Sequence, residues 1–195
     1  MARPTGDRRV QRTRSALVRS FNELFLTEGY DGATPARIAE AADVGRSTFY
    51  EHFSGKEDLL RERLTAVLAP VADAVCAATI PPRLEFVLDH FWSNRAALRE
   101  LLSGRAGTVA MRELSALVLQ RLSSISQGPA PALPLPLAAA QVAGGQLALI
   151  EEWLCGRHAC SAAALARGLY ESSCAAAAIS SGDLANRCCC VHASR

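Results

Sequence analysis

The sequence predicts an all-α fold, and three observations carry that prediction. Apolar residues recur at helical spacing along most of the 195-residue chain, whereas the alternating pattern of a strand is nearly absent. Small polar residues, prolines and glycines stand where helices would begin and end. Half of the residues are hydrophobic, so the chain can bury a substantial core in one large domain or two small ones.

A first amphipathic helix is predicted to end near Gly29. Leu17, Phe21, Leu24 and Phe25 fall at i, i+4, i+7 and i+8, which places them on one apolar stripe, and the neighbouring arginines fall off it. Glycine takes the left-handed conformation without steric cost, so Gly29 suits the end of this helix.

A second helix is predicted to begin at Thr34, whose hydroxyl can accept a hydrogen bond from the free N–H groups of the first turn. Pro35 fits the first helical position, because its missing N–H does no harm there. Ile38 belongs to the inward face. The helix ends at "AADVG", where Asp43 and Gly45 can bend the chain tightly.

The stretch "RSTFYEHF", residues 46–53, predicts a short third helix with two different faces. Phe49 and Phe53 are four residues apart, so they share a face that can meet Ile38 and the apolar stripe of the first helix. The residues off that face form an exposed polar surface: Arg46, Ser47, Thr48, Tyr50 and Glu51.

Helical periodicity continues through the rest of the chain. A fourth helix is predicted to open with a capping box between Ser54 and Glu57 and to run to about Ala78, with a kink at Pro70. Further helices are predicted over residues 83–104 with a break near Asn94, and over 108–125, 137–157 and 161–179. Between the helices predicted over 108–125 and 137–157, residues 126–136 are proline-rich and indicate a linker.

Basic residues are concentrated at the N-terminus. Residues 1–20 hold six arginines against one aspartate, a formal charge of +5, whereas the remainder holds 15 basic and 18 acidic residues. This distribution indicates either a contact with a polyanion or a solvated tail, and both interpretations stay open.

The sequence also predicts a cytoplasmic protein without a membrane segment. No stretch is apolar enough to span a bilayer, and polar residues interrupt "ALVRSFNELFL", so it is not the core of a signal peptide. The seven cysteines are odd in number and lack framework spacing, which predicts reduced thiols.

The second and third helices together have the arrangement of a helix-turn-helix. In that motif the second helix fits the major groove of DNA, and its N-terminal residues meet base edges. Ser47 and Thr48 are short enough to let the backbone approach, and Arg46 can reach a guanine edge or a phosphate. The periodicity alone fits a helical hairpin that does not bind DNA equally well.

The stretch "EGYDGATPARIAEAADVGRSTFYEHFSGKEDLL" resembles the N-terminal signature of the TetR family of transcriptional regulators, without gaps from about Arg14 to Leu60. The resemblance implies a dimeric repressor that binds a palindromic operator on double-stranded DNA and is released by a small molecule, here unidentified. It implies a helix-turn-helix domain over residues 1–60 and a ligand-binding and dimerisation domain over 61–180. Residues 181–195 have no apolar period, which predicts a disordered tail.

The resemblance also assigns roles to single residues. Positions that usually hold DNA phosphates match Thr34, Tyr50, His52 and Lys56. Recognition-helix positions that face bases or backbone match Arg46, Ser47 and Thr48. Three residues depart from the family pattern or bear on DNA contact: Asp43 stands for a frequent glycine, Gly45 stands where serine often caps the helix, and Glu51 puts a carboxylate near DNA.

The C-terminal half offers weaker candidates. Apolar and aromatic residues that could line a ligand cavity, or simply pack, are Phe86, His90, Phe91, Trp92 and Met111. The resemblance implies a dimer interface on the last two helices, which are rich in small residues, with the candidates Leu147, Ile150, Leu154, Leu165, Leu169 and Tyr170.

No cofactor, metal or catalytic site is expected. The adjacent cysteines of "CCCVH", at residues 188–192, do not imitate the separated pairs of zinc sites, and Cys155, His158 and Cys160 form a weak candidate. Catalytic signatures are absent from the sequence, so we expect no enzyme. The alternative function is a helical protein-interaction module with a vestigial helix-turn-helix.

Overall fold

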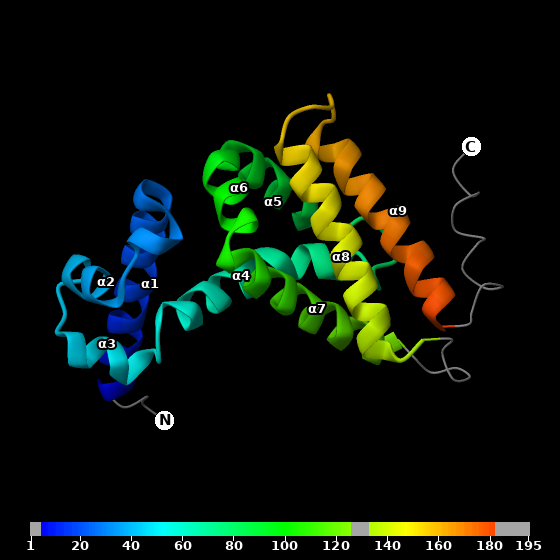
Figure 1. Ribbon diagram of the computed structural model, residues 1–195. Coiled ribbons are helices and arrows are strands. Elements are labelled where there is room, and N and C mark those ends of the chain that lie inside the picture. The colour runs from blue at the N-terminus through cyan, green and yellow to red at the C-terminus, as the bar shows by residue number, and fades with distance from the viewer. Residues whose placement is uncertain (1–4, 126–132, 182–195) are drawn as a thin grey trace. The chain divides into compact units, whose positions relative to one another are not determined.

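The computed structural model describes residues 5–125 and 133–181. Over those residues the chain is helical and contains no strand, which confirms the all-α prediction (Figure 1). The helices are α1 (Thr5–Gly32), α2 (Pro35–Ala41), α3 (Arg46–His52), α4 (Lys56–Asp73), α5 (Pro82–Ser93), α6 (Arg95–Ser103), α7 (Arg105–Ile125), α8 (Leu135–Leu154) and α9 (Ala162–Ser181). None of them is long and apolar enough to cross a membrane.

The helices form two compact units. The first comprises Met1–Leu64 and Ala96–Val109, and the second comprises Thr65–Arg95 and Ala110–Arg195. The core of the first unit contains the apolar stripe of α1 together with residues of α2 and α3. Its fully buried large side chains include Leu17, Phe21, Ile38 and Phe49. The faces of these helices are therefore the ones that their spacing predicts.

The predicted turns of the first unit adopt the backbone conformations that their residues favour. Gly29 has φ 73° and kinks α1, and Asp43 has φ 54° in the turn between α2 and α3. The Thr34 hydroxyl accepts a hydrogen bond from the N–H of Arg37 at 3.4 Å, as the capping prediction requires.

The capping prediction for α4 names the wrong carboxylate. The amide and hydroxyl of Ser54 both donate to Asp58, not to Glu57, and these bonds hold the pKa of the Asp58 carboxyl below its usual value. The helix begins at Lys56, so it is the side chain of its third residue that reaches back to Ser54.

Helix α4 also ends earlier than predicted, at Asp73 instead of near Ala78. The N–H groups of residues 74–76 donate to carbonyls three residues back, so the chain tightens into turns. At this end of α4 the Val71 carbonyl accepts two hydrogen bonds, one from the N–H of Ala74 at 3.3 Å and one from the amide nitrogen of Gln146 at 2.9 Å.

In the second unit, α9 packs against both α5 and α8 (Figure 1). The large side chains buried there include Leu88 of α5, Leu114 of α7, Ile150 of α8 and Leu169 of α9. The predicted break near Asn94 is confirmed, since Asn94 ends α5 and its side-chain amide donates to the His90 carbonyl at 2.9 Å.

Candidate nucleic-acid interface

Helix α3 presents a polar face to solvent from an apolar anchor. Phe49 is fully buried and Phe53, just beyond the helix, is almost so, with their ring centroids 6.1 Å apart. Arg46, Ser47 and Tyr50 are exposed. The guanidinium of Arg46 lies 5.9 Å from the centroid of the Tyr50 ring, so the two side chains form one continuous surface. Thr48 is half-buried beside them.

Arg14 of α1 holds the C-terminal end of α3. Its Nη1 donates to the His52 carbonyl at 3.4 Å, and its guanidinium lies 4.4 Å from the centroid of the Phe53 ring. Its other nitrogen pairs with Glu62 of α4. This role of Arg14 was not predicted from the sequence. Arg14 lies off the apolar stripe of α1, and spacing within one helix does not reveal partners 38 and 48 residues away.

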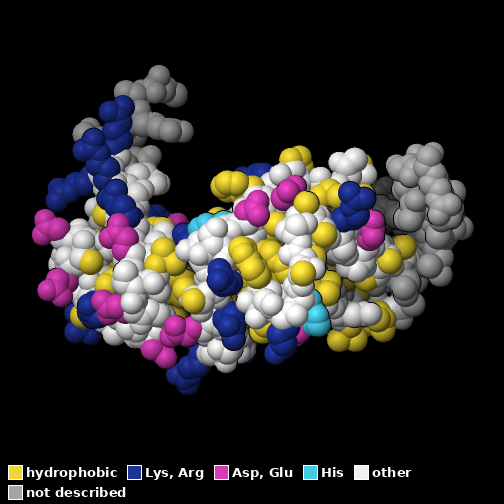
Figure 2. Space-filling view, turned by 90° about the horizontal axis from the view of Figure 1, so that it is seen from above, with side chains coloured by type: hydrophobic (Ala, Val, Ile, Leu, Met, Phe, Trp, Pro, Cys, Tyr) yellow, Lys and Arg dark blue, Asp and Glu magenta, His cyan; other side chains and the backbone are white. Residues whose placement is uncertain are grey.

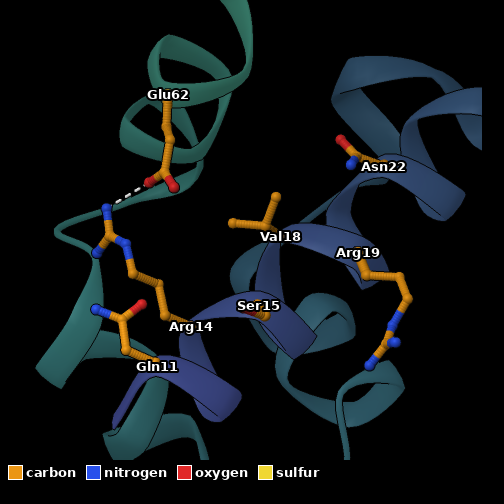
Figure 3. A pocket seen from close by; sticks show the side chains of 7 residues that line it. All are labelled: Gln11, Arg14, Ser15, Val18, Arg19, Asn22 and Glu62. Carbon is orange, nitrogen blue, oxygen red and sulfur yellow. Dashed lines mark hydrogen bonds and ion pairs between the residues drawn. The ribbon is translucent and has the colours of Figure 1, made fainter. Parts of the chain in front are cut away.

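Arg14 and Glu62 also border a groove of about 310 Å³ along α1 (Figure 3). The other α1 side chains that line it are Gln11, Ser15, Val18, Arg19 and Asn22. The side-chain oxygen of Asn22 is buried and has no hydrogen-bond partner among the described residues.

Lys56 has several partners within the protein. Its Nζ donates to the Tyr30 carbonyl at 2.8 Å, lies 4.1 Å from the centroid of the Tyr30 ring, and is 3.6 Å from a carboxylate oxygen of Asp31. Only 24% of the side chain is exposed. Lys56 therefore joins the start of α4 to the end of α1, and its predicted phosphate contact would have to compete with these bonds.

The other two predicted phosphate contacts lie at helix ends. Thr34 is exposed at the start of α2, where its hydroxyl is engaged as the cap. His52 is half-buried in the last turn of α3, and its carbonyl is the one that Arg14 binds. With α3 itself, these residues give the first unit a helix-turn-helix whose turn is set by Asp43 and whose second helix has a free polar face.

The family model described as bacterial regulatory proteins, tetR family, matches residues 19–62, which include α2 and α3. This segment of the chain matches the TetR family. It is 42% identical over 60 residues to the transcriptional regulator TcmR of Streptomyces glaucescens; the match covers 31% of this chain and 26% of that protein. The chain thus spans about a quarter of that relative's length.

Solved structures of TetR regulators share the fold beyond the matched segment. A regulator from Streptococcus agalactiae aligns with a TM-score of 0.58 at 24% identity, over 86% of this chain and 97% of the other. The repressor FadR of Thermus thermophilus, solved with lauroyl-CoA, aligns with a TM-score of 0.52 at 22% identity, over 84% and 92% of the two chains.

The predicted TetR-type ligand cavity does not gather the residues that were expected to line it. Phe86 is 71% exposed, and His90 and Trp92 are also exposed on α5. Phe91 is buried, and Met111 is half-buried. The reason is helical phase: α5 turns Leu84, Val87, Leu88 and Phe91 inward, so positions 86 and 90 face solvent.

A polar site in the second unit was missed. Gln146 of α8 and Ser173 of α9 are each 2% exposed, and the Gln146 amide nitrogen donates to the Ser173 hydroxyl as well as to the Val71 carbonyl, both at 2.9 Å. The Gln146 oxygen has no hydrogen-bond partner among the described residues. A single amide on an otherwise apolar helix face was the signal that could have revealed it.

The predicted dimer residues lie inside the subunit. Five of the six are buried, namely Leu147, Ile150, Leu154, Leu165 and Leu169. The sixth, Tyr170, donates its hydroxyl to the Ala78 carbonyl at 3.0 Å. These side chains form the subunit's own core, so a second copy would meet other faces of α8 and α9. The exposed residues there include Gln141, Gly145, Ala148, Leu149 and Glu152 on α8, and Ala164, Gly168, Glu171 and Ala175 on α9.

The structure describes one of the two groups of cysteines that the sequence offered as weak metal-site candidates. Cys160 is exposed and Cys155 half-buried, on either side of the exposed His158 in the segment between α8 and α9. The "CCCVH" segment lies outside the described residues. Among the residues that the structure does describe, no three acidic, cysteine or histidine side chains gather as they would around a metal ion.

Proposed function

We propose that this chain is a transcriptional regulator that binds a palindromic operator as a homodimer, represses transcription there, and is released by a small molecule. The exposed face of α3 supports this proposal most directly. Arg46, Ser47 and Tyr50 project from a short helix that Phe49 and Phe53 anchor in the core. A helix mounted in this way can enter the major groove without disturbing its own packing.

Within that interface we assign two kinds of contact. Arg46 and Thr48 read bases, since an arginine can pair with guanine and a threonine can contact base edges or a thymine methyl group. Tyr50, His52 and Thr34 hold phosphates, which positions the helix but carries no sequence information. Lys56 contributes mainly by fixing the start of α4 through Tyr30 and Asp31.

The small-residue faces of α8 and α9 support the homodimer. Gly145, Ala148 and Leu149 of α8 share one side of the helix, as Ala164, Gly168 and Ala175 do on α9, and all are exposed in the subunit. Small side chains let helices of two copies approach closely, and a two-fold interface needs a surface complementary to itself. A dimer places two copies of α3 on the two halves of a palindrome.

The second unit is the proposed site of ligand response. Its interior is apolar, and Gln146 supplies a buried acceptor with no partner among the described residues. The related FadR of Thermus thermophilus was solved with lauroyl-CoA, and its fold extends over most of this chain. A ligand that binds one conformation of the dimer better than the other would shift the spacing of the two α3 helices and lower operator affinity.

Selection of bound duplexes from random DNA, followed by mobility shift, tests the proposal. The wild type is expected to select a palindrome. Arg46→Ala should relax the preference at one or two base positions, with a loss of about 1–3 kcal/mol on the selected site. Tyr50→Ala should weaken binding to all sequences alike. A wild type that retards no DNA at any salt concentration would contradict the proposal and favour the protein-interaction module.

A further inference from the structure

Several cations of the first unit have partners inside the unit. Arg14 pairs with Glu62, Arg37 with Glu28, and Arg61 with Asp58. Lys56 is held by Tyr30 and Asp31. Each of these cations therefore already has an acidic or carbonyl partner with which a phosphate would have to compete.

The first turns of α1 are different. Arg8, Arg9 and Arg12 are all exposed, and none has an ion pair or hydrogen bond with another described residue. Figure 2 shows basic side chains gathered on this end of α1, next to the grey N-terminal residues. Because α1 is already helical from Thr5, these arginines are mounted on a rigid element rather than on a loose arm.

The position of these turns is set by α3. Arg14 reaches the His52 carbonyl, so α1 passes the end of α3 at about that level. From there the helix continues toward its N-terminus on the side of α3 away from α2 (Figure 1). At 1.5 Å per residue, Arg12 lies about 3 Å and Arg8 about 9 Å farther along the axis. With α3 in the major groove, as proposed above, this end of α1 would lie beside that groove.

We propose that Arg8, Arg9 and Arg12 form a second DNA contact, on the phosphate backbone beside the groove that α3 enters. The proposal rests on the proposed function of α3 as the recognition helix. The guanidinium group suits phosphate because its N–H donors bind two oxygens at once. The three residues precede the segment 19–62 that the TetR family model matches, so the family signature does not include them.

The double variant Arg8→Ala/Arg12→Ala tests this contact in the full chain. Its association constant at about 0.1 M salt should fall tenfold or more, and by the same factor on the selected operator and on an unrelated duplex, because phosphate contacts do not read sequence. The slope of log K against log salt should decrease by about two per subunit. Arg8→Lys/Arg12→Lys should keep most of the slope, since it keeps the charge.

Arg19→Ala is the matched control for Arg12→Ala. Arg19 is exposed on the same face of α1 and also lies outside every ion pair seen among the described residues, but it is about 10 Å farther from the N-terminal end. Loss of affinity in Arg12→Ala well above that in Arg19→Ala supports a local contact. Equal losses would show a diffuse charge effect and overturn the inference.

The two proposals fail in different ways. If the wild type binds no DNA, the proposed function and this inference both fall. If Arg46→Ala changes base preference while Arg8→Ala/Arg12→Ala binds like the wild type, the inference alone is wrong. Thermal unfolding of each variant should match the wild type, because the exposed arginines make no bonds to other described residues.

Discussion

Tyr30 combines two roles at the junction of α1 and α4. Its carbonyl and ring hold Lys56, whereas its hydroxyl is buried without a hydrogen-bond partner among the described residues. Burial raises the pKa of Tyr30 to about 12, and the nearby carboxylates of Glu57 and Asp31 add to the effect. The ring and backbone therefore stabilise the junction, while the hydroxyl opposes it, since an unpaired buried polar group is costly.

Tyr30→Phe should therefore stabilise the protein at pH 7, by about 1 kcal/mol, because the ring remains and the unpaired hydroxyl is removed. The raised pKa also has a consequence at high pH. Above pH 10 the unfolded chain loses the tyrosine proton before the folded protein does, so the free energy of unfolding falls until about pH 12. Denaturant titrations across pH 7–12 should show a smaller decline for Tyr30→Phe, and an equal decline would contradict the assignment.

The backbone conformations and the cap of three single residues could be predicted from the sequence. Gly29, Thr34 and Asp43 have the conformations or bonds that their side chains favour, and each involves neighbours within a few positions. Arg14 and Lys56 were different, because their partners come from distant parts of the chain. No spacing rule within one helix contains that information.

At the scale of elements, α3 depends on its anchors. A seven-residue helix has too few internal hydrogen bonds to be stable alone, so tertiary packing must hold it. Phe49 is fully buried and contacts the rings of Phe53 and Tyr50, at centroid distances of 6.1 and 5.2 Å. In α3, Phe49 thus stabilises the packing of the helix, whereas the neighbouring Tyr50 is exposed and available for DNA contact.

Phe49→Ala should lower the free energy of unfolding by about 3–5 kcal/mol, since it removes a buried aromatic ring and leaves a cavity. Tyr50→Ala is the matched comparison one position away. Tyr50 is 48% exposed, so the loss in the free energy of unfolding should stay below about 1 kcal/mol while DNA binding weakens. Urea denaturation measures both variants. Similar losses would mean that the two faces of α3 are not separated as described.

For the longer helices, the sequence predicted their presence better than their ends and faces. Helix α4 ends earlier than predicted, and its last turn is bonded through the Val71 carbonyl to Gln146, a residue 75 positions away. On α8 and α9 the inward face was not evident, because alanine, glycine and leucine occur around the whole circumference. Periodicity identifies a buried face only where the opposite face is polar.

At the scale of the whole molecule, assembly is expected to depend on the small-residue faces of α8 and α9. A Cβ atom added at Gly145 or Gly168 meets nothing within 4 Å in the subunit. A larger side chain at either position therefore fits in the isolated subunit. It would collide only with a second copy packed against these faces. Substitutions at these two glycines can therefore change assembly without changing the folding of the subunit.

Gly145→Gln and Gly168→Gln should weaken dimerisation at least tenfold while leaving helicity unchanged or higher, because glutamine is a better helix former than glycine. Analytical ultracentrifugation measures the dimer and circular dichroism measures the helices. Ala116→Gln, at an exposed position of α7, is the control and should not change assembly. Dimers of normal affinity in both glycine variants would place the interface elsewhere.

The all-α class, the cap of α2, the turns at Gly29 and Asp43, and the TetR-like segment could all be predicted from the amino-acid sequence. These features depend on residues a few positions apart, where side-chain chemistry acts directly on the local backbone. The packing of the helices, in contrast, sets the partners of Arg14 and Lys56 and the faces of α5, α8 and α9 that are buried. These outcomes arise from contacts between segments far apart in the chain, and such contacts exist only once the helices have packed.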